Sequence, residues 1–179
     1  MIALSFEDKG DGDLLIREAK KDERHLVKQQ RLSSYESYKD ELSHKQWHLL
    51  KSNLECDTDQ HPGVKVFVAE VGLEIVGSVV LFPAKTKTFH WNGEATPYPE
   101  IRLLAVIPEL RLRGVGTALV EHCLDISKIS KQQYVGLYTG SFMKHAIALY
   151  EKMGFERIHS LDLPLIPNGV AVEAFRFDL

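Results

Sequence analysis

The sequence is poor in cysteine and contains no long hydrophobic run. Its 179 residues include only two cysteines, Cys56 and Cys123, so a disulfide framework is not indicated. No segment approaches the roughly 18 apolar residues of a membrane-spanning helix, and no basic and then apolar leader opens the chain. We therefore expect a cytoplasmic protein without membrane contact.

An excess of charge of either sign is also lacking. The 22 lysines and arginines against 25 aspartates and glutamates give a formal net charge of −3, and the basic residues are scattered along the chain. A nucleic-acid-binding protein typically gathers positive charge on one face or along one helix. We therefore expect no nucleic-acid partner.

The histidines and serines do not form the motifs of a metal site or a hydrolase. His44 and His48 share one helix face, but Lys45 and Gln46 follow His44 where a zinc protease motif places a glutamate, and no third ligand is evident. Ser141 lacks the flanking pattern of a nucleophile elbow. We predict no metal site, and a hydrolase is disfavoured.

The length and the hydrophobic pattern predict one α/β domain. The polar, glycine-interrupted residues 1–13 are expected to be a mobile lead-in, and residues 14–179 a single domain. Segments rich in β-branched and apolar residues predict strands, and the segments between them, whose apolar residues recur with a helical period, predict helices. Strands are expected over 14–18, 64–71, 74–82, 101–107, 134–139, 155–159 and 170–177, and helices after a cap at Asp22, around Trp47, over 116–129 and over 142–153.

The most informative segment is an arginine- and glycine-rich turn between the expected strand 101–107 and the helix that follows. Gly114 and Gly116 remove side chains that would keep a ligand from the main chain, and the first N–H groups of a helix have no intrahelical partners. Arg111 and Arg113 add positive charge beside this turn. The segment predicts a site for a ligand that carries a diphosphate.

Two common phosphate loops do not fit this turn. A Walker loop requires a Gly-Lys pair, which occurs nowhere in the chain. A dinucleotide fingerprint requires a third glycine where Leu119 stands, and an acidic residue about 20 residues further on, where 131–137 has none. The remaining pattern is Arg111, two residues, Gly114, one residue and Gly116. It resembles the signature of the GNAT superfamily of acyl-coenzyme A-dependent N-acetyltransferases.

The surroundings of the turn resemble the same family. The expected strand 101–107 is similar to the family's fourth strand, and Ala146–Phe155 is similar to its second cofactor segment. The resemblance spans roughly residues 14–179. It implies an α/β (α+β) fold with a mixed, mostly antiparallel central sheet, flanked by about four helices. This sheet would be split between the fourth and fifth strands, with a bulge near 104–106.

The resemblance implies an acetyl-coenzyme A-dependent N-acetyltransferase without a metal, which acetylates a primary amine by direct attack in a ternary complex. The acceptor would be a small-molecule amine or a peptide amine, and two copies would pair through the final strands. A non-catalytic module that binds or senses acyl-coenzyme A is the alternative from a different functional class. One departure favours this alternative: many relatives carry an asparagine where Met143 stands, so that a cofactor contact is either lost or supplied by Ser141.

The resemblance also implies roles for individual residues. The backbone N–H of Val106 would face the acetyl carbonyl. Tyr150 shares a helical stripe with Ala146 and Leu149, and it would either protonate the leaving thiolate or serve as a core tyrosine. Glu100, six residues before Val106, would be a general base or only a solvated charge. The cofactor-binding residues would be Leu104, Ala105, Val106, Arg111, Leu112, Arg113, Gly114, Val115, Gly116, Thr117 and Tyr150.

Acceptor contacts are expected from two variable segments. Tyr35, Glu36 and Tyr38 lie between the first two helices, where relatives often border the acceptor pocket, although a helix end that shields the core is the more common explanation for such residues. Trp91 lies in a long connection between strands. These four residues are the candidate substrate contacts.

Overall fold

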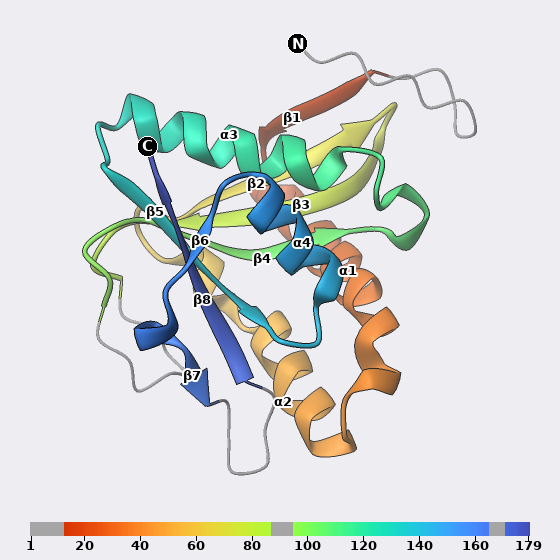
Figure 1. Ribbon diagram of the computed structural model, residues 1–179. Coiled ribbons are helices and arrows are strands. Elements are labelled where there is room, and N and C mark those ends of the chain that lie inside the picture. The colour runs from red at the N-terminus through yellow and green to blue at the C-terminus, as the bar shows by residue number, and fades with distance from the viewer. Residues whose placement is uncertain (1–12, 87–94, 165–170) are drawn as a thin grey trace.

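The computed structural model describes residues 13–86, 95–164 and 171–179 (Figure 1). The expected lead-in over 1–13 therefore lies outside the described residues, except for Asp13. Trp91 also lies outside them. All structural statements below concern the described ranges.

The described chain alternates strands and helices in the expected order. Its strands are β1 Leu14–Glu18, β2 Lys65–Val71, β3 Glu74–Phe82, β4 Glu100–Val106, β5 Tyr134–Gly140, β6 Glu156–Arg157, β7 Leu163–Pro164 and β8 Ala171–Asp178. Its α-helices are α1 Arg24–Tyr35, α2 His44–Glu55, α3 Val115–Ile129 and α4 Lys144–Lys152. Short 3-10 helices are η1 Lys21–Glu23, η2 Glu36–Glu41, η3 Asp57–Gln60, η4 Pro108–Leu110 and η5 His159–Leu161. The mixed α/β class is confirmed.

Most expected elements are confirmed within a few residues, and three details were wrong. Asp22 does not cap α1, because it lies inside η1. The preceding turn is closed instead by Glu23, whose carboxylate accepts the backbone N–H of Lys20 at 2.7 Å and pairs with Arg17 at 2.6 Å. The strand expected over 155–159 shortens to β6 because the chain turns into η5. The two-residue β7, which pairs with β8, was not expected.

The strands form one sheet in the order β1-β2-β3-β4-β5-β8-β6, with β7 also paired to β8. Every described pair is antiparallel except β4 with β5, which run parallel. A parallel neighbour requires a crossover connection, and α3 supplies it. The mostly antiparallel sheet with a parallel pair at its centre is therefore confirmed.

Helices cover both faces of this sheet (Figure 1). α3 and α4 pack over the face that carries the main core, which includes Ile101 and Leu137 of the two central strands. α1 and α2 cover the opposite face, against smaller clusters to which Leu103 and Ala105 of β4 contribute. Side chains of β4 thus serve two cores, as expected for a central strand buried on both faces.

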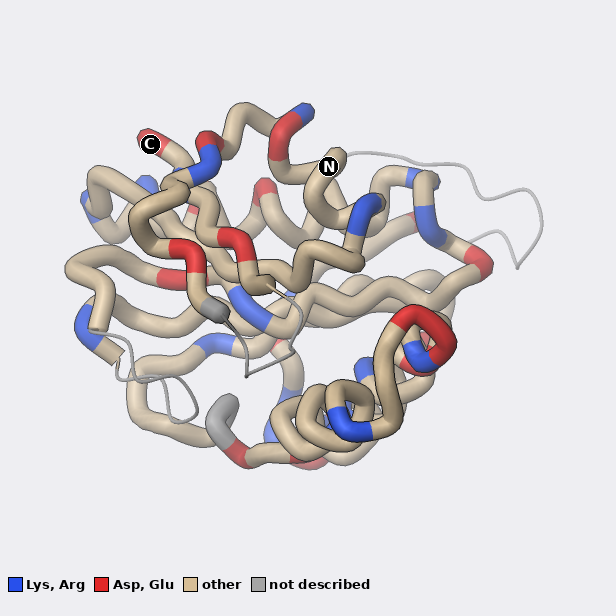
Figure 2. The backbone as a smooth tube through the Cα atoms, turned by 60° about the horizontal axis from the view of Figure 1, so that its bottom comes forward, with Lys and Arg blue, Asp and Glu red and all other residues tan. Residues whose placement is uncertain are grey.

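The charged residues follow no single pattern over the molecule. Acidic and basic residues are interspersed over the backbone, without a region of one sign (Figure 2). None of the helices in the described ranges is both long enough and apolar enough to span a bilayer.

Candidate functional site

The central feature of the site is the separation of β4 from β5. These parallel strands pair only at Glu100 with Gly136 and at Ile101 with Leu137. Beyond this point, within the described residues, β4 has a strand partner only on its β3 side. The expected split between the fourth and fifth strands of the sheet is confirmed.

A bulge in β4 lies where the strands separate. Arg102 pairs with Val80 and Ala105 pairs with Ser78, so two residues of β4, Leu103 and Leu104, oppose one residue of β3. Leu103 has a positive φ of 55°, which leucine rarely adopts. A bulge of this kind bends a strand and leaves backbone groups unpaired. It lies slightly earlier in β4 than the expected position near 104–106.

The loop after β4 leads directly to the first turn of α3. η4 occupies Pro108–Leu110, and both Leu112 and Gly114 have positive φ, 61° and 86°. A backbone that alternates in this way can direct successive N–H groups at one anion. Gly114 is the N-cap of α3 and no side chain caps this helix end, so its first N–H groups are open to a ligand.

Gly116 keeps the start of α3 close to its neighbours. A Cβ at this position would lie 3.3 Å from Leu149 Cδ2 and 3.8 Å from Val106 Cγ2. The first turn of α3 therefore approaches both α4 and the end of β4. A side chain at this position would have to displace Leu149.

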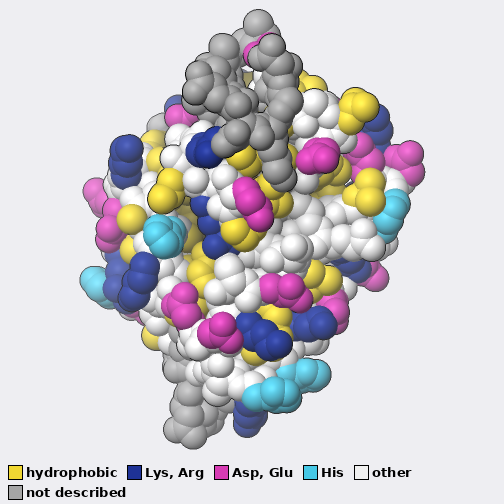
Figure 3. Space-filling view, turned by 90° about the vertical axis from the view of Figure 1, so that its right-hand side faces the viewer, with side chains coloured by type: hydrophobic (Ala, Val, Ile, Leu, Met, Phe, Trp, Pro, Cys, Tyr) yellow, Lys and Arg dark blue, Asp and Glu magenta, His cyan; other side chains and the backbone are white. Residues whose placement is uncertain are grey.

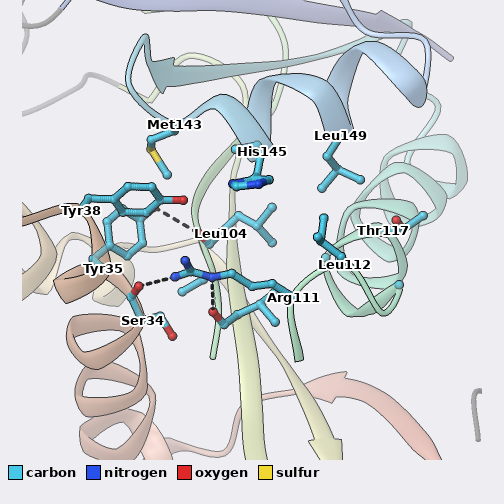
Figure 4. Close-up of a pocket in the computed structure, with 15 residues that line it drawn as sticks. Ser34, Tyr35, Tyr38, Leu104, Arg111, Leu112, Thr117, Met143, His145 and Leu149 are labelled. Atoms are coloured by element: carbon cyan, nitrogen blue, oxygen red, sulfur yellow. Dashed lines mark hydrogen bonds between the residues drawn. The ribbon is translucent and has the colours of Figure 1, made fainter. Parts of the chain in front are cut away.

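These elements enclose a cleft, which we define by its lining residues (Figure 4). They come from the end of α1 with η2, from β4, from the loop before α3 with its first turn, and from the start of α4. The lining residues are Ser34, Tyr35, Tyr38, Leu104, Ala105, Val106, Arg111, Leu112, Gly114, Gly116, Thr117, Met143, His145, Ala146 and Leu149. In Figure 3, which shows the side of the molecule that carries α1, small hydrophobic patches lie among acidic and basic side chains.

The Arg111 side chain is engaged by protein groups. It donates to the Val106 carbonyl from Nε at 3.2 Å, to Ser37 Oγ at 2.9 Å, and to the Ser34 carbonyl near the end of α1. Its guanidinium also lies 5.4 Å from the centre of the Tyr38 ring. Arg111 thus joins the loop between β4 and α3, which we call the cofactor loop (residues 107–114), to the α1–η2 wall of the cleft (Figure 4).

Two tyrosines, Tyr35 and Tyr38, line the end of the cleft near Met143 (Figure 4). Tyr35 donates its hydroxyl to the Leu104 carbonyl at 3.0 Å, and it stacks edge-on with Tyr38 at 5.9 Å. Burial raises the pKa of Tyr35, Tyr38 and Tyr150 above the usual value for a phenol, and the neighbouring tyrosines add to this effect at Tyr35 and Tyr150. All three hydroxyls are therefore neutral at physiological pH.

Tyr150 lies behind the cleft and does not line it. It is 5% exposed and packs against Phe155 and Phe175 in the main core. Among the described residues no hydrogen-bond partner occupies its hydroxyl.

Glu100 is buried at the start of β4, outside the cleft lining. Its Oε1 accepts from Thr96 Oγ1 at 2.7 Å and its Oε2 accepts from Arg102 Nε at 2.8 Å. Arg102 in turn lies over the Phe82 ring at 4.3 Å. Both carboxylate oxygens are therefore engaged with protein donors.

The structure brings together most, but not all, of the residues that the sequence singled out. Arg113 and Glu36 are exposed and lie outside the lining, and Val115 is fully buried in the core. The remaining cofactor candidates line the cleft, with the exception of Tyr150. Sequence reasoning did not single out Ser34 or His145, although His145 directly precedes Ala146 of the second cofactor segment.

A metal centre has no support in the described part of the chain. No three histidine, cysteine, aspartate or glutamate side chains of that part lie together in a way that could hold an ion. Besides its apolar side chains, the site offers backbone groups, hydroxyls, one imidazole and one engaged guanidinium.

Comparisons with curated proteins give partial matches. An uncharacterized N-acetyltransferase of Methanocaldococcus jannaschii is 35% identical over 83 residues, which are 46% of this chain and 37% of that protein. N-acetyltransferase family 8 member 2 of Rattus norvegicus is 27% identical over 111 residues, 62% of this chain and 47% of that protein. The chain thus matches about a third to a half of the length of these relatives.

Solved structures share the fold over nearly the whole chain. A GNAT-family acetyltransferase of Staphylococcus aureus Mu50 superposes with a TM-score of 0.68 at 16% identity, covering 93% of this chain and 99% of that one. A Salmonella typhimurium protein solved with its cofactor acetyl-CoA gives a TM-score of 0.63 at 16% identity, covering 93% and 94%. The family model for the Acetyltransferase (GNAT) family matches residues 24–155, most of the chain. This protein therefore belongs to the GNAT acetyltransferase family.

Proposed function

We propose that this chain transfers an acetyl group from acetyl-coenzyme A to a primary amine by direct attack within a ternary complex. One observation carries the proposal: a single cleft joins the open edge of β4 to the uncapped, glycine-bared first turn of α3. The first feature suits an extended chain with amide groups, and the second suits a diphosphate. Coenzyme A has both parts.

The binding roles follow from this arrangement. The N–H groups of Gly114, Gly116 and Thr117 would hold the diphosphate, and the exposed Arg113 would add positive charge nearby. The main chain of 104–106 would pair with the extended arm as an added strand would. The Arg111 side chain would shape the cleft rather than bind phosphate, because protein acceptors already engage it.

The chemistry requires a neutral amine, a stabilised oxygen and a protonated thiol. Acetyl-coenzyme A supplies an activated acetyl thioester. The Val106 backbone N–H would stabilise the negative charge that develops on the acetyl oxygen, and one such donor is typically worth on the order of a hundredfold in rate. The Tyr150 phenol is protonated at neutral pH and would give its proton to the leaving sulfur, although burial, which raises its pKa, makes it a weaker acid than a free phenol.

The base that deprotonates the acceptor amine would act without direct contact in this arrangement. An alkylammonium has a pKa of about 10.4 and must lose a proton before attack. Both oxygens of Glu100 accept hydrogen bonds from the protein, so we propose that Glu100 acts through intervening groups rather than by direct contact with the amine. Tyr35 and Tyr38 would form the acceptor wall of the cleft, and the acceptor would be a small-molecule or peptide amine.

A second candidate is an acyl-coenzyme A-binding module without turnover. Two observations favour it: Tyr150 and Glu100 both lie outside the cleft lining, and Met143 stands where many relatives carry an asparagine. The cleft itself is common to both candidates. Binding alone therefore does not distinguish them.

Thiol release separates the two candidates. Purified protein is incubated with acetyl-coenzyme A and a panel of amines, amino acids, aminoglycosides and peptides, and free thiol is followed over time. A reaction without acceptor corrects for hydrolysis. Release that depends on an acceptor supports the transferase, whereas tight binding by calorimetry without release across the panel supports the module. Absence of any coenzyme A binding would refute both.

A further inference from the structure

The position of Met143 contributes no polar group to the cleft. Its sulfur accepts a contact from Thr139 Oγ1 at 3.6 Å, and the side chain is 9% exposed. Ser141, the other residue expected to supply a polar contact, does not line the cleft, and its backbone N–H donates to the Ala171 carbonyl at 2.9 Å. The polar contact that relatives would make here must come from another residue or be missing.

Two carbonyls of β4 beside the cleft are already occupied. The Leu104 carbonyl accepts from the Tyr35 hydroxyl at 3.0 Å, and the Val106 carbonyl accepts from Arg111 Nε at 3.2 Å. An arm with amide groups brings N–H donors as well as carbonyl acceptors, and a buried donor without a partner is costly. Each carbonyl oxygen keeps a second lone pair, but its protein donor already occupies one direction of approach, so a further acceptor in the cleft would add to the binding of such an arm.

Most other polar groups of the lining also have partners. Ser34 Oγ accepts from Gln30 Nε2 at 2.9 Å, and the Arg111 guanidinium is fixed as described above. Thr117 lies in the first turn of α3, at the proposed diphosphate end. The Tyr38 hydroxyl, which no hydrogen bond to a described residue engages, belongs to the Met143 end of the cleft, so the polar side chains of Tyr38 and Thr117 serve its two ends (Figure 4).

His145 is the exception among these side chains. It is exposed, it lines the cleft from the first turn of α4, and no hydrogen bond or ion pair joins it to another residue of the described ranges. Figure 4 shows its ring projecting from α4 toward Leu104, between the Met143 end and the Leu149 end of the cleft. A neutral imidazole carries one nitrogen that accepts a hydrogen bond and one that donates.

We propose that His145 binds the amide-bearing arm of coenzyme A from the α4 side of the cleft. Its accepting nitrogen takes an amide N–H of the arm. This assignment rests on the proposed function, because it presumes that coenzyme A occupies the cleft. His145 is thus a cofactor-binding residue that the glycine motif does not include.

Calorimetry with two ligands tests the proposal. One ligand is coenzyme A, and the other is 3′-phosphoadenosine 5′-diphosphate, which keeps the diphosphate and lacks the amide arm. His145→Ala should weaken coenzyme A binding by about three- to tenfold, the usual effect of one hydrogen bond, and leave binding of the fragment unchanged. His145→Gln, which retains an acceptor oxygen, should recover most of the lost affinity.

His44→Ala is the matched control, because His44 is also an exposed histidine in the first turn of a helix but lies outside the cleft lining. It should change neither affinity. Equal weakening of both ligands by His145→Ala would overturn the proposal, because the imidazole would then bind phosphate. Unchanged coenzyme A affinity would overturn it as well. If the unaltered protein does not bind coenzyme A, the proposed function itself fails.

Discussion

Leu112 has an unfavourable backbone conformation in the cofactor loop, and glycine at this position should stabilise the protein. Its φ is +61°, and its side chain is 86% exposed, so that little burial is lost on truncation. A left-handed conformation costs a non-glycine residue about 1–2 kcal/mol. Glycine costs about 0.4–1 kcal/mol through the greater entropy of the unfolded chain. The difference predicts that Leu112→Gly raises the free energy of unfolding by about 0.5–1 kcal/mol.

Leu73 provides the control for this substitution. It is 96% exposed and lies in the turn between β2 and β3, but it is not among the described residues with positive φ. Leu73→Gly therefore relieves no strain and should destabilise the protein by about 0.4–1 kcal/mol. The two variants remove the same exposed side chain and differ mainly in the sign of φ.

Urea unfolding and thermal melts measure the difference between these variants. A chain of this size shifts its melting temperature by about 2–4 °C for each kcal/mol, so the two variants should separate clearly. If Leu112→Gly unfolds no later than Leu73→Gly, the loop carries no strain and the reasoning is refuted. Coenzyme A affinity should be retained in Leu112→Gly, because the backbone N–H groups of the loop remain.

Three further substitutions test the site. Tyr150→Phe should lower kcat about tenfold or more by removing the proton donor, with little change in acetyl-coenzyme A affinity; unchanged kcat in a folded variant would remove Tyr150 from the mechanism. Gly116→Ala places a methyl group 3.3 Å from Leu149 Cδ2, and both residues line the cleft where the ligand would meet the first turn of α3. Coenzyme A affinity measured by calorimetry should therefore fall, while the melting temperature stays near that of the parent. Unaltered affinity would mean that the first turn of α3 does not meet the ligand. Burial raises the pKa of the Cys123 thiol to about 12, so the unfolded state loses its proton first and stability should fall as pH rises above about 9. Cys123→Val should flatten this decline in alkaline melts, and an identical pH profile would contradict the assignment.

The sequence by itself determined the order of elements and the position of the glycine-bearing start of α3. The run of β-branched and apolar residues located β3 to the residue, because a strand buried on both faces carries a nearly continuous apolar sequence. The spacing of Gly114 and Gly116 located the uncapped start of α3, because the need for bare backbone is local. The two-residue β6 and β7 had no such signal, since their only support is pairing with β8.

Only the tertiary structure decided what each polar side chain of the site meets. Arg111 donates to the carbonyl of Ser34, 77 positions earlier in the chain, so its guanidinium is held against α1, which its motif did not indicate. Glu100 is engaged by Thr96 and Arg102, and burial against aromatic rings places Tyr150 behind the cleft. Periodicity states which face of an element is buried. It cannot state which distant donor or acceptor packs there, because that depends on how separate elements are brought together.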